Sequence, residues 1–333
     1  MNKSSQPSAE TPPQKLVSLL ADGRFHPGEE LGEQLGVSRA AVWKQIQKLQ
    51  EAGLDVQSVR GKGYRLGHPL EWLDRAAILE AMDPQAAAVL TQLDIVPVLS
   101  STNDRALAQA SQGMGSGYVC LAEQQLAGRG RRGRPWVSPF ASNLYASVLW
   151  EFEQGVAQLE GLSLATGVVV AEALQALGVP DLSLKWPNDL LLAGAKLGGI
   201  LLEITGDPAG PCQVVLGVGI NHRLPPAAAG TIDQSWGRLQ DVKPDLGRNL
   251  LAARVLSTLL NMLRRFAVAG FAGYQQRWQA LDAFADTDVI LSTGTEERRG
   301  VARGVDRTGG LLLETESGLA VIKGGEISLR SRP

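Results

Sequence analysis

The sequence holds few of the residues that build metal centres or disulfide frameworks. Its 333 residues include two cysteines, Cys120 and Cys212, and three histidines, His26, His68 and His222. Two cysteines are too few for a disulfide framework, and they lack the CxxC spacing that is typical of zinc or redox sites. The histidines lie far apart along the chain, so neither a His-rich metal site nor a histidine-based triad is expected. We therefore predict no protein metal ligands.

The sequence also gives no indication of a targeting or membrane-spanning segment. Residues 1–13 are polar and contain three prolines, so we predict a disordered tail and not a signal peptide. The longest apolar stretch, Leu162–Val179, is interrupted by Glu172 and Gln175 and is expected to be too short and too polar to cross a bilayer. Reduced thiols without a signal or a span predict a cytoplasmic protein with no membrane partner.

The bulk composition is that of an ordinary globular protein. Hydrophobic residues make up 44% of the chain and charged residues 20%, and a length of 333 residues predicts two or three domains. The net charge of -2 indicates nothing about a polyanionic partner, so any basic binding surface must be local.

The first unit is predicted to span residues 14–66. Two short amphipathic helices, 14–21 and 28–35, are followed by a tight turn, and Ser38 is a good N-cap for a third helix over 39–52. Two strand-like runs within 54–66 surround a basic, glycine-rich tip and predict a hairpin. This order of elements predicts a winged helix-turn-helix.

Basic residues are concentrated in the third helix and the hairpin of this unit. Residues 38–66 contain six lysines and arginines against two acidic residues, which suits contacts with DNA phosphates. The candidates for DNA contact are Ser38, Arg39, Lys44, Gln45, Lys48, Arg60 and Lys62. A helix-turn-helix usually binds paired half-sites as a dimer, so operator DNA and a second copy of the chain are the expected partners.

Beyond a short linker at 67–69, two further units are predicted. Strands and helices are mixed over residues 71–281, and the strands are rarely separated by single helices, which favours an α+β or mixed sheet over a doubly wound parallel sheet. Residues 285–330 contain short alternating runs separated by glycine-containing turns, which predicts a small β-barrel.

The densest chemical signal is the loop Gly128–Arg134, in which four arginines alternate with three glycines. Exposed backbone N–H groups between glycines form an anion nest, and arginine adds bidentate donors for phosphate or carboxylate. The loop follows a strand and precedes Trp136, so we expect it to overhang a site. The alternative is a solvated basic loop or an RG-rich nucleic-acid segment, although such segments usually recur as repeats. No GxxxxGK[ST] loop occurs, so ATP would need this different phosphate-binding device.

Four other motifs each allow a structural and a functional interpretation. Ser100–Asn103 suits a helix N-cap but could bind a polar ligand, and Lys185–Asp189 suits a strand ending in an Asx-type turn. Lys196–Ile200 could cap a hairpin, or its ammonium could stabilise a carboxylate and a developing phosphate charge together. Gly217–Asn221 is expected to form a bulge or turn, with a ligand role as the alternative.

The order of these motifs closely resembles that of the biotin–protein ligases. The closing segment Gly324–Arg330 is similar to the C-terminal end of that family, and the N-terminal unit is similar to that of its bifunctional bacterial members, which also repress biotin synthesis genes. The resemblance runs from about residue 14 to 330. It implies an α+β multidomain protein with a winged helix at 14–66, a catalytic domain at 71–281 related to class II aminoacyl-tRNA synthetases, and an SH3-like barrel at 285–330.

The resemblance also implies a two-step reaction. Biotin and ATP give biotinyl-5′-AMP and pyrophosphate, and the biotinyl group then moves to a lysine of the biotin carboxyl carrier protein of acetyl-CoA carboxylase. Mg²⁺ would share the charge of ATP through phosphate oxygens. The adenylate is expected to promote dimerisation and operator binding.

Site residues follow from the same resemblance. The implied biotin-binding residues are Ser101, Thr102, Asn103, Gln125, Arg129, Gly130, Arg131 and Lys196, with Gln125 beside the ureido ring. The implied nucleotide-binding residues are Arg129, Arg131, Arg132, Lys185, Asn188, Asn221 and Trp236, with Trp236 stacked on adenine. Lys196, Arg131 and Lys185 are the implied catalytic residues.

Two other functions compete with this interpretation. A lipoate–protein ligase would share the fold and chemistry but act on another acid, and such enzymes generally lack the winged helix and the Gly128–Arg134 loop. A ligand-sensing repressor without catalysis is the second alternative. The presence of both Lys185 and Lys196 argues against it.

Overall fold

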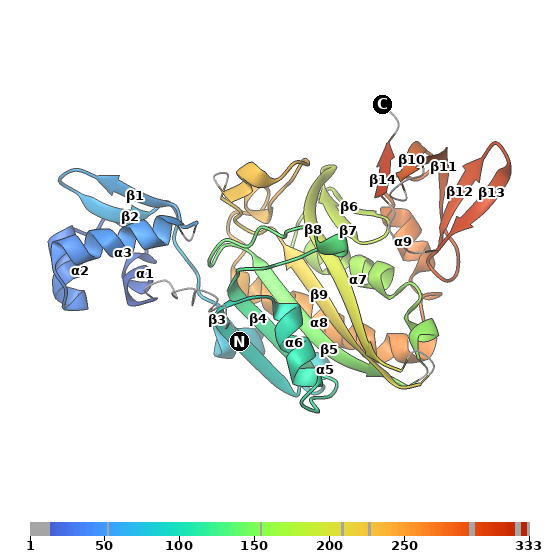
Figure 1. The fold of residues 1–333 in the computed structure, drawn as a ribbon, viewed down its shortest axis with the longest axis horizontal. Coiled ribbons are helices and arrows are strands. Elements are labelled where there is room, and N and C mark those ends of the chain that lie inside the picture. The colour runs from blue at the N-terminus through green and yellow to red at the C-terminus, as the bar shows by residue number, and fades with distance from the viewer. Residues whose placement is uncertain are drawn as a thin grey trace, which may run out of the picture.

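The computed structural model describes residues 14–331 except 52, 154, 208–209, 226–227, 293–296 and 324–327. The predicted tail at 1–13 and the start of the closing motif at 324–327 lie outside the described residues. Figure 1 shows a small helical unit with a hairpin at one end, a central sheet with helices on its faces, and a second sheet at the other end. The domain boundaries at 14–66, 71–281 and 285–330 are kept as a proposal.

The N-terminal unit has the predicted order of elements. These are α1 (Gln14–Leu20), α2 (Gly28–Leu35), α3 (Arg39–Glu51) and the antiparallel hairpin of β1 (Val56–Val59) and β2 (Gly63–Leu66). Gly36 adopts a φ of 68° and ends α2, and the Ser38 hydroxyl accepts a hydrogen bond of 3.2 Å from the N–H of Ala41 at the start of α3. The predicted winged helix-turn-helix is therefore confirmed.

The central unit is built on a seven-stranded mixed sheet with the order β3-β4-β5-β9-β8-β7-β6. The strands are β3 (Gln92–Leu99), β4 (Tyr118–Gln125), β5 (Leu144–Phe152), β6 (Leu182–Lys185), β7 (Asp189–Leu192), β8 (Ala195–Gly206) and β9 (Cys212–Ile220). The β3–β4 pair is parallel and the other pairs are antiparallel. A mixed sheet is what the sequence predicts, and the doubly wound alternative is excluded.

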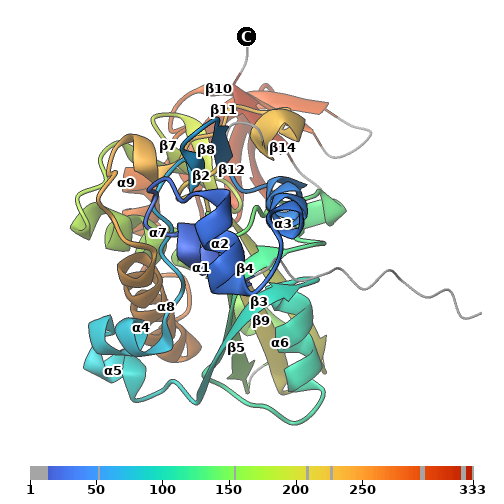
Figure 2. The same ribbon diagram turned by 90° about the vertical axis from the view of Figure 1, so that its left-hand side faces the viewer.

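Helices cover both faces of this sheet because its strands are apolar on both sides. Along β4, Tyr118 and Cys120 pack with α6 (Thr102–Ala110), while the alternate residues Val119 and Leu121 join the large core around α7 (Leu162–Ala176) and α8 (Arg248–Ala269). Figure 2 shows α6 and α8 on opposite sides of the strands. Two short helices, α4 (Arg75–Ala81) and α5 (Pro84–Ala87), were not predicted, and α9 (Gln275–Leu281) follows α8.

The segment Val156–Ala176 is long and apolar enough, by length and composition, to cross a membrane. It is longer than the apolar stretch expected from the sequence because a 3-10 turn, Val156–Leu159, precedes α7. Ten of the fifteen residues of α7 are buried, and eight of these belong to the large core. A largely apolar helix that is packed in this way is a core helix.

The C-terminal unit is an antiparallel sheet of five described strands in the order β13-β12-β11-β10-β14. The strands are β10 (Asp288–Ser292), β11 (Glu297–Val305), β12 (Leu311–Thr315), β13 (Gly318–Ile322) and β14 (Ser328–Ser331). A register shift between Ala302 and Val305 bends β11 against β12. Close strand spacing thus correctly predicts a small β-rich unit, and its closure into an SH3-like barrel stays a prediction.

Candidate functional site

A cavity of about 890 Å³ opens where the central sheet meets the loops that join its strands. Its walls come from the start of α6, the end of β4, the loop after β4, the β6–β7 connection, and strands β8 and β9. These predicted residues line it: Ser101, Thr102, Asn103, Gln125, Arg129, Gly130, Arg131, Arg132, Lys185, Asn188 and Lys196. Motifs that lie up to about a hundred positions apart are therefore brought to one site.

The arginine–glycine loop closes on itself and overhangs this cavity. The N–H of Gly130 donates to the carbonyl oxygen of Arg134 at 2.8 Å, and Arg129 pairs with Pro135 as an isolated β-bridge. Between them runs a short 3-10 turn in which Arg132 has a φ of 60°. Because Arg129 and Arg131 are half-buried and line the cavity, a fully solvated basic loop is not supported.

A polar network forms the end of the cavity at the start of α6. Gln125 accepts hydrogen bonds from the N–H of Thr102 at 2.9 Å and from its hydroxyl at 3.1 Å. The fully buried Ser147 hydroxyl lies 2.7 Å from the Thr102 hydroxyl and 2.5 Å from Oδ1 of Asn103. Ser101 caps α6 through the N–H of Asn103. The N-cap prediction is therefore confirmed, and the same residues also line the cavity.

Two glycines of β9 make room for this site. A Cβ atom on Gly217 would lie 2.4 Å from Oδ1 of Asn103, and one on Gly219 would lie 2.7 Å from the indole ring of Trp136. The strand is regular here and pairs in register with β5 and β8, so the expected bulge or turn at Gly217–Asn221 is wrong. The glycines serve the close approach of side chains to a flat strand.

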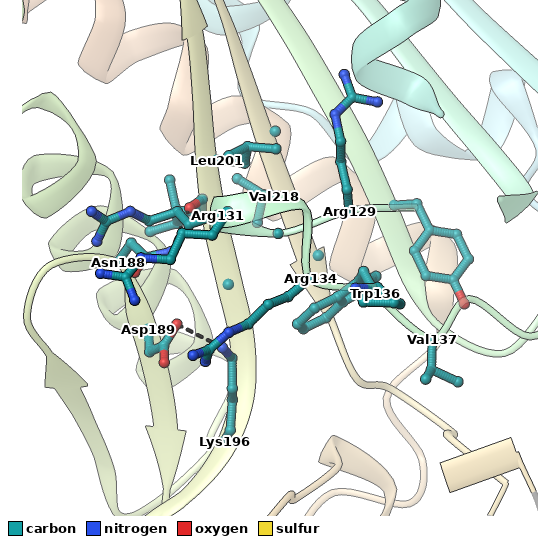
Figure 3. Close-up of a pocket in the computed structure, with 18 of the residues that line it drawn as sticks. Arg129, Arg131, Arg134, Trp136, Val137, Asn188, Asp189, Lys196, Leu201 and Val218 are labelled. Atoms are coloured by element: carbon teal, nitrogen blue, oxygen red, sulfur yellow. Dashed lines mark hydrogen bonds and ion pairs between the residues drawn. The ribbon is translucent and has the colours of Figure 1, made fainter. Parts of the chain in front are cut away.

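Lys196 is positioned by contacts on both of its sides. Its ammonium lies 2.8 Å from Oδ1 of Asp189 and 5.8 Å from the centre of the Trp136 ring. Figure 3 shows Lys196, Asp189 and Arg134 meeting on one side of the pocket, while the Arg129 side chain points to the other side. The ammonium is thus held at the cavity wall, which supports the functional interpretation of the Lys196–Ile200 motif over a hairpin cap alone.

The Lys185–Asp189 segment joins β6 to β7 as a turn and lines the cavity at the same time. Asn188 donates from its side-chain amide to the carbonyl oxygen of Ile200 at 2.8 Å and so fastens the turn to β8. Lys185 is half-buried, with its ammonium 5.8 Å from the centre of the Phe284 ring. Both interpretations of this motif are therefore compatible with the structure.

Asn221 and Trp236 are not among the residues that line the cavity. Asn221 is buried, and its side-chain amide donates to the carbonyl oxygens of Lys196 at 3.4 Å and Gly237 at 3.1 Å. Trp236 forms an isolated β-bridge with Lys196, and its ring lies 6.0 Å from the guanidinium of Arg238. Both residues support the segment around Lys196 in this structure.

Positive charge dominates the cavity. Among the described residues, six cationic side chains line it, from Arg129, Arg131, Arg132, Arg134, Lys185 and Lys196, against the two carboxylates of Asp189 and Asp233. Burial, and then the neighbouring Arg132, lower the pKa of Arg131 from its usual value. An anionic ligand that enters the cavity would relieve this repulsion.

The predicted DNA-binding residues lie on one helix and on the hairpin tip. Ser38, Arg39, Lys44, Lys48, Arg60 and Lys62 are exposed. Gln45 is only half-exposed, and its Oε1 atom is buried without a hydrogen-bond partner among the described residues, so its contact with DNA stays a prediction. The sequence analysis overlooked Trp43, whose side chain on α3 is 53% exposed.

Several other residues of the site were also overlooked. Arg134, Trp136 and Asp189 lie within or beside the quoted motifs, and their proximity to those motifs could have indicated them. Ser147 lies on β5, which carries no motif, and Glu203 lies on β8 beyond the Lys196–Ile200 motif, so only the folded sheet brings both to Asn103.

Comparison with known proteins agrees with the geometry. Residues 95–221 match the Biotin/lipoate A/B protein ligase family, residues 14–65 an HTH domain, and residues 288–330 the Biotin protein ligase C terminal domain. The chain is 47% identical over 321 residues to the bifunctional ligase/repressor BirA of Salmonella typhimurium, which covers 96% of this chain and 98% of that protein. The corresponding Escherichia coli protein is 46% identical over the same length.

A solved structure gives the same result for the fold. The biotin protein ligase from Aquifex aeolicus in complex with biotin and ATP superposes with a TM-score of 0.63 at 29% identity, and the match covers 73% of this chain and 100% of that one. With its helix-turn-helix, its cationic cavity and its C-terminal β-unit in this order, the chain belongs to the biotin protein ligase family, among the bifunctional ligase/repressors.

Proposed function

We propose that this protein activates biotin with ATP to form biotinyl-5′-AMP and transfers the biotinyl group to a lysine of the biotin carboxyl carrier protein. The observation that carries the proposal is a single cavity with a polar end formed by Thr102, Asn103 and Gln125 and a cationic end formed by Lys196 and the arginine loop. A ring with hydrogen-bonding groups and a carboxylate tail fits such a cavity.

In the first step, a carboxylate oxygen of biotin attacks the α-phosphorus of ATP. The bond from that phosphorus to its bridging oxygen breaks, and pyrophosphate leaves with the bond electrons. Two anions must approach each other in line, so positive charge has to offset their repulsion. Lys196, which Asp189 holds at the cavity wall, would contact both the carboxylate and the α-phosphate. Lys185 and Arg131 would stabilise the remaining phosphate charge.

In the second step, the amine of the acceptor lysine attacks the carbonyl carbon of the adenylate. The bond from this carbon to the phosphate oxygen breaks, AMP leaves, and the nitrogen loses a proton to give an amide. A mixed anhydride hydrolyses in water, so a loop that covers it must exclude water until the acceptor arrives. The Gly128–Arg134 loop overhangs the cavity and suits this purpose.

Mg²⁺ is proposed as the metal that accompanies ATP. Within the described ranges, no group of three or more histidine, cysteine, aspartate or glutamate side chains forms a metal site. Of the two cavity carboxylates, Asp189 is paired with Lys196. These residues fit a metal that is bound mainly by phosphate oxygens and water, where it would neutralise charge on the polyphosphate.

The helix-turn-helix is proposed to bind operator DNA and to repress biotin synthesis genes, with the adenylate promoting homodimerisation. Phe140, a few positions after the arginine loop, is buried in the core of the N-terminal unit and packs edge-on against Trp72. Ordering of the loop by ligand can therefore reach the DNA-binding unit directly. We also propose that the protein acts in the cytoplasm.

One labelling experiment tests the ligase function against its rivals. The purified chain is incubated with ATP, a carrier acceptor domain and either labelled biotin or labelled lipoate, and pyrophosphate and label on the acceptor are measured. We expect pyrophosphate release and acceptor labelling with biotin. Labelling with lipoate alone would identify a lipoate ligase, and neither product would identify a sensor without catalysis.

Operator binding is tested separately. Duplexes that the protein selects from a random pool are titrated with and without biotin and ATP. We expect tighter binding and a dimer when both are present. Unchanged DNA affinity would refute the coupling between adenylate and operator.

A further inference from the structure

Glu203 on β8 connects two parts of the site without lining the cavity itself. Its Oε2 atom accepts a hydrogen bond of 2.7 Å from the side-chain amide of Asn103. Both of its carboxylate oxygens lie within hydrogen-bond distance of Nη2 of Arg129, at 2.8 and 3.0 Å. One carboxylate thus contacts the polar end of the cavity and the first arginine of the loop.

The contact with Asn103 fixes which way its amide faces. A carboxylate is only an acceptor, so the nitrogen of the Asn103 amide must face Glu203. The oxygen of the same amide then faces Ser147, 2.5 Å away, and Gly217 leaves the room that it needs. This arrangement leaves Asn103 one N–H and one carbonyl lone pair for a ligand, in a fixed orientation.

The contact with Arg129 anchors the arginine loop. Arg129 is also paired with Asp104 of α6 at 2.6 Å, so two carboxylates from different elements hold its guanidinium. The hydrogen bonds that Arg129 donates to Asp104 and then to Glu203 keep its pKa above the usual value. The first arm of the loop is therefore tied to β8 and to α6, although its tip is exposed.

We infer that Glu203 is a positioning residue that makes the site specific for an acid whose ring donates and accepts hydrogen bonds, and that keeps the loop closed over the adenylate. The inference rests on the proposed ligase function. An acid with a ring that forms no hydrogen bonds gains nothing from an oriented Asn103, so Glu203 favours a ureido ring over a purely apolar one.

Three variants separate the two contacts. Glu203→Ala removes both, Glu203→Gln retains an acceptor for Asn103 but loses the charge opposite Arg129, and Asp104→Asn weakens the hold on Arg129 while the Glu203–Asn103 contact stays in place. For each variant, KM for biotin, KM for ATP and the rate of adenylate release from the purified complex are measured. Thermal unfolding of each variant monitors the fold.

We expect Glu203→Ala to raise KM for biotin about tenfold or more while KM for ATP changes less than about twofold, as the loss of one charge-assisted hydrogen bond predicts. Adenylate release should become faster. Glu203→Gln should have a KM for biotin near the parent value but should still release the adenylate faster than the parent. Asp104→Asn should change the rate of adenylate release more than KM for biotin.

An Asn103→Ala, Glu203→Ala double variant adds a test of coupling. We expect its KM for biotin to equal that of Asn103→Ala alone, because Glu203 acts through Asn103. Additive effects, or equal rises in KM for biotin and ATP in Glu203→Ala, would overturn the inference. Absence of adenylate formation by the parent protein would instead refute the proposed function.

Discussion

The indole N–H of Trp186 donates a hydrogen bond of 3.0 Å to the carbonyl oxygen of Gly309 and so joins the central unit to the C-terminal unit. Trp186 is almost fully buried and directly follows Lys185 in the β6–β7 connection. Gly309 lies in a turn that Asp306 holds by accepting hydrogen bonds from Thr308 and Gly310. The C-terminal unit therefore supports a wall of the cavity.

Trp186→Phe should weaken nucleotide binding without abolishing catalysis. An aromatic ring is retained, although phenyl is smaller than indole, and one hydrogen bond is lost, which leaves the Gly309 carbonyl without this donor at a cost of about 1 kcal/mol. We expect KM for ATP to rise about fivefold and KM for biotin to change little, measured by pyrophosphate exchange. Asp306→Ala should act in the same direction, and a change in KM for biotin alone would contradict the idea.

Local signals predict some parts of this molecule well. The turn around Gly36 and the cap at Ser38 were visible because their chemistry is contained within a few neighbouring residues. The cavity residues were predicted as motifs, and their order along the chain indicated that they act together. What holds those motifs was not predictable, because Ser147 and Glu203 reach Asn103 only through strand order and register.

The error at Gly217–Asn221 has a related cause. Glycine in a strand usually indicates a turn or bulge, but here it accommodates Asn103 and the Trp136 ring from elsewhere in the fold. The short helices α4 and α5 were missed because they carry too few residues for a clear apolar period.

Lys196→Ala should abolish adenylate formation while the fold is retained. The side chain is partly exposed and supplies the cation closest to the paired Asp189, so its loss removes charge stabilisation from the first step. We expect pyrophosphate exchange to fall by roughly two to three orders of magnitude. Asp189→Asn should lower pyrophosphate exchange about tenfold, since it removes the charged partner that positions the Lys196 ammonium. Normal exchange in Lys196→Ala would exclude the proposed role.

Arg131→Gly should make the protein release its adenylate into solution. The variant removes a half-buried cation from the covering loop and adds backbone freedom there. We expect labelling of lysines on unrelated proteins that are mixed with the enzyme, biotin and ATP. Arg132→Gly, in the exposed part of the same loop, is the matched comparison and should release less. Equal background labelling by the parent and by Arg131→Gly would argue against a covering role.

Acid should destabilise the fold through His222. Burial lowers its pKa to about 4, whereas the unfolded chain has a value near 6.5. Between these values the unfolded state binds more protons, so the free energy of unfolding rises with pH from about 4 to 6.5, by about 3 kcal/mol. Burial also raises the pKa of Asp282 to about 6, and this shift makes the free energy of unfolding fall as the pH rises.

A variant separates the contribution of His222 from that of Asp282. Urea unfolding at several pH values is compared between the parent and His222→Gln, which retains a donor for the carbonyl oxygen of Leu246. The parent should lose stability relative to the variant as the pH falls below 6.5. Parallel curves would show that His222 titrates alike in the folded and unfolded states.

Trp43 is expected to set part of the operator sequence. It lies on the same face of α3 as Arg39 and Gln47, one turn away from each, and its side chain is 53% exposed. An apolar ring on a helix in the major groove can contact the methyl group of thymine. We expect Trp43→Ala to weaken binding to a selected duplex about tenfold and to leave adenylate formation unchanged.

Base substitution in the duplex makes this prediction specific. Replacing thymines one at a time by deoxyuridine removes a methyl group and nothing else. At the contacted position the loss of the methyl group should weaken DNA binding by the parent protein. It should not change DNA binding by Trp43→Ala. Lys44→Ala, which alters a phosphate contact, should weaken binding to all duplexes alike and reduce the salt dependence by about one ion. If each uracil weakened DNA binding equally in the parent and in Trp43→Ala, the indole would contact no thymine methyl group. The interaction lost with the methyl group would then be one that the variant still makes.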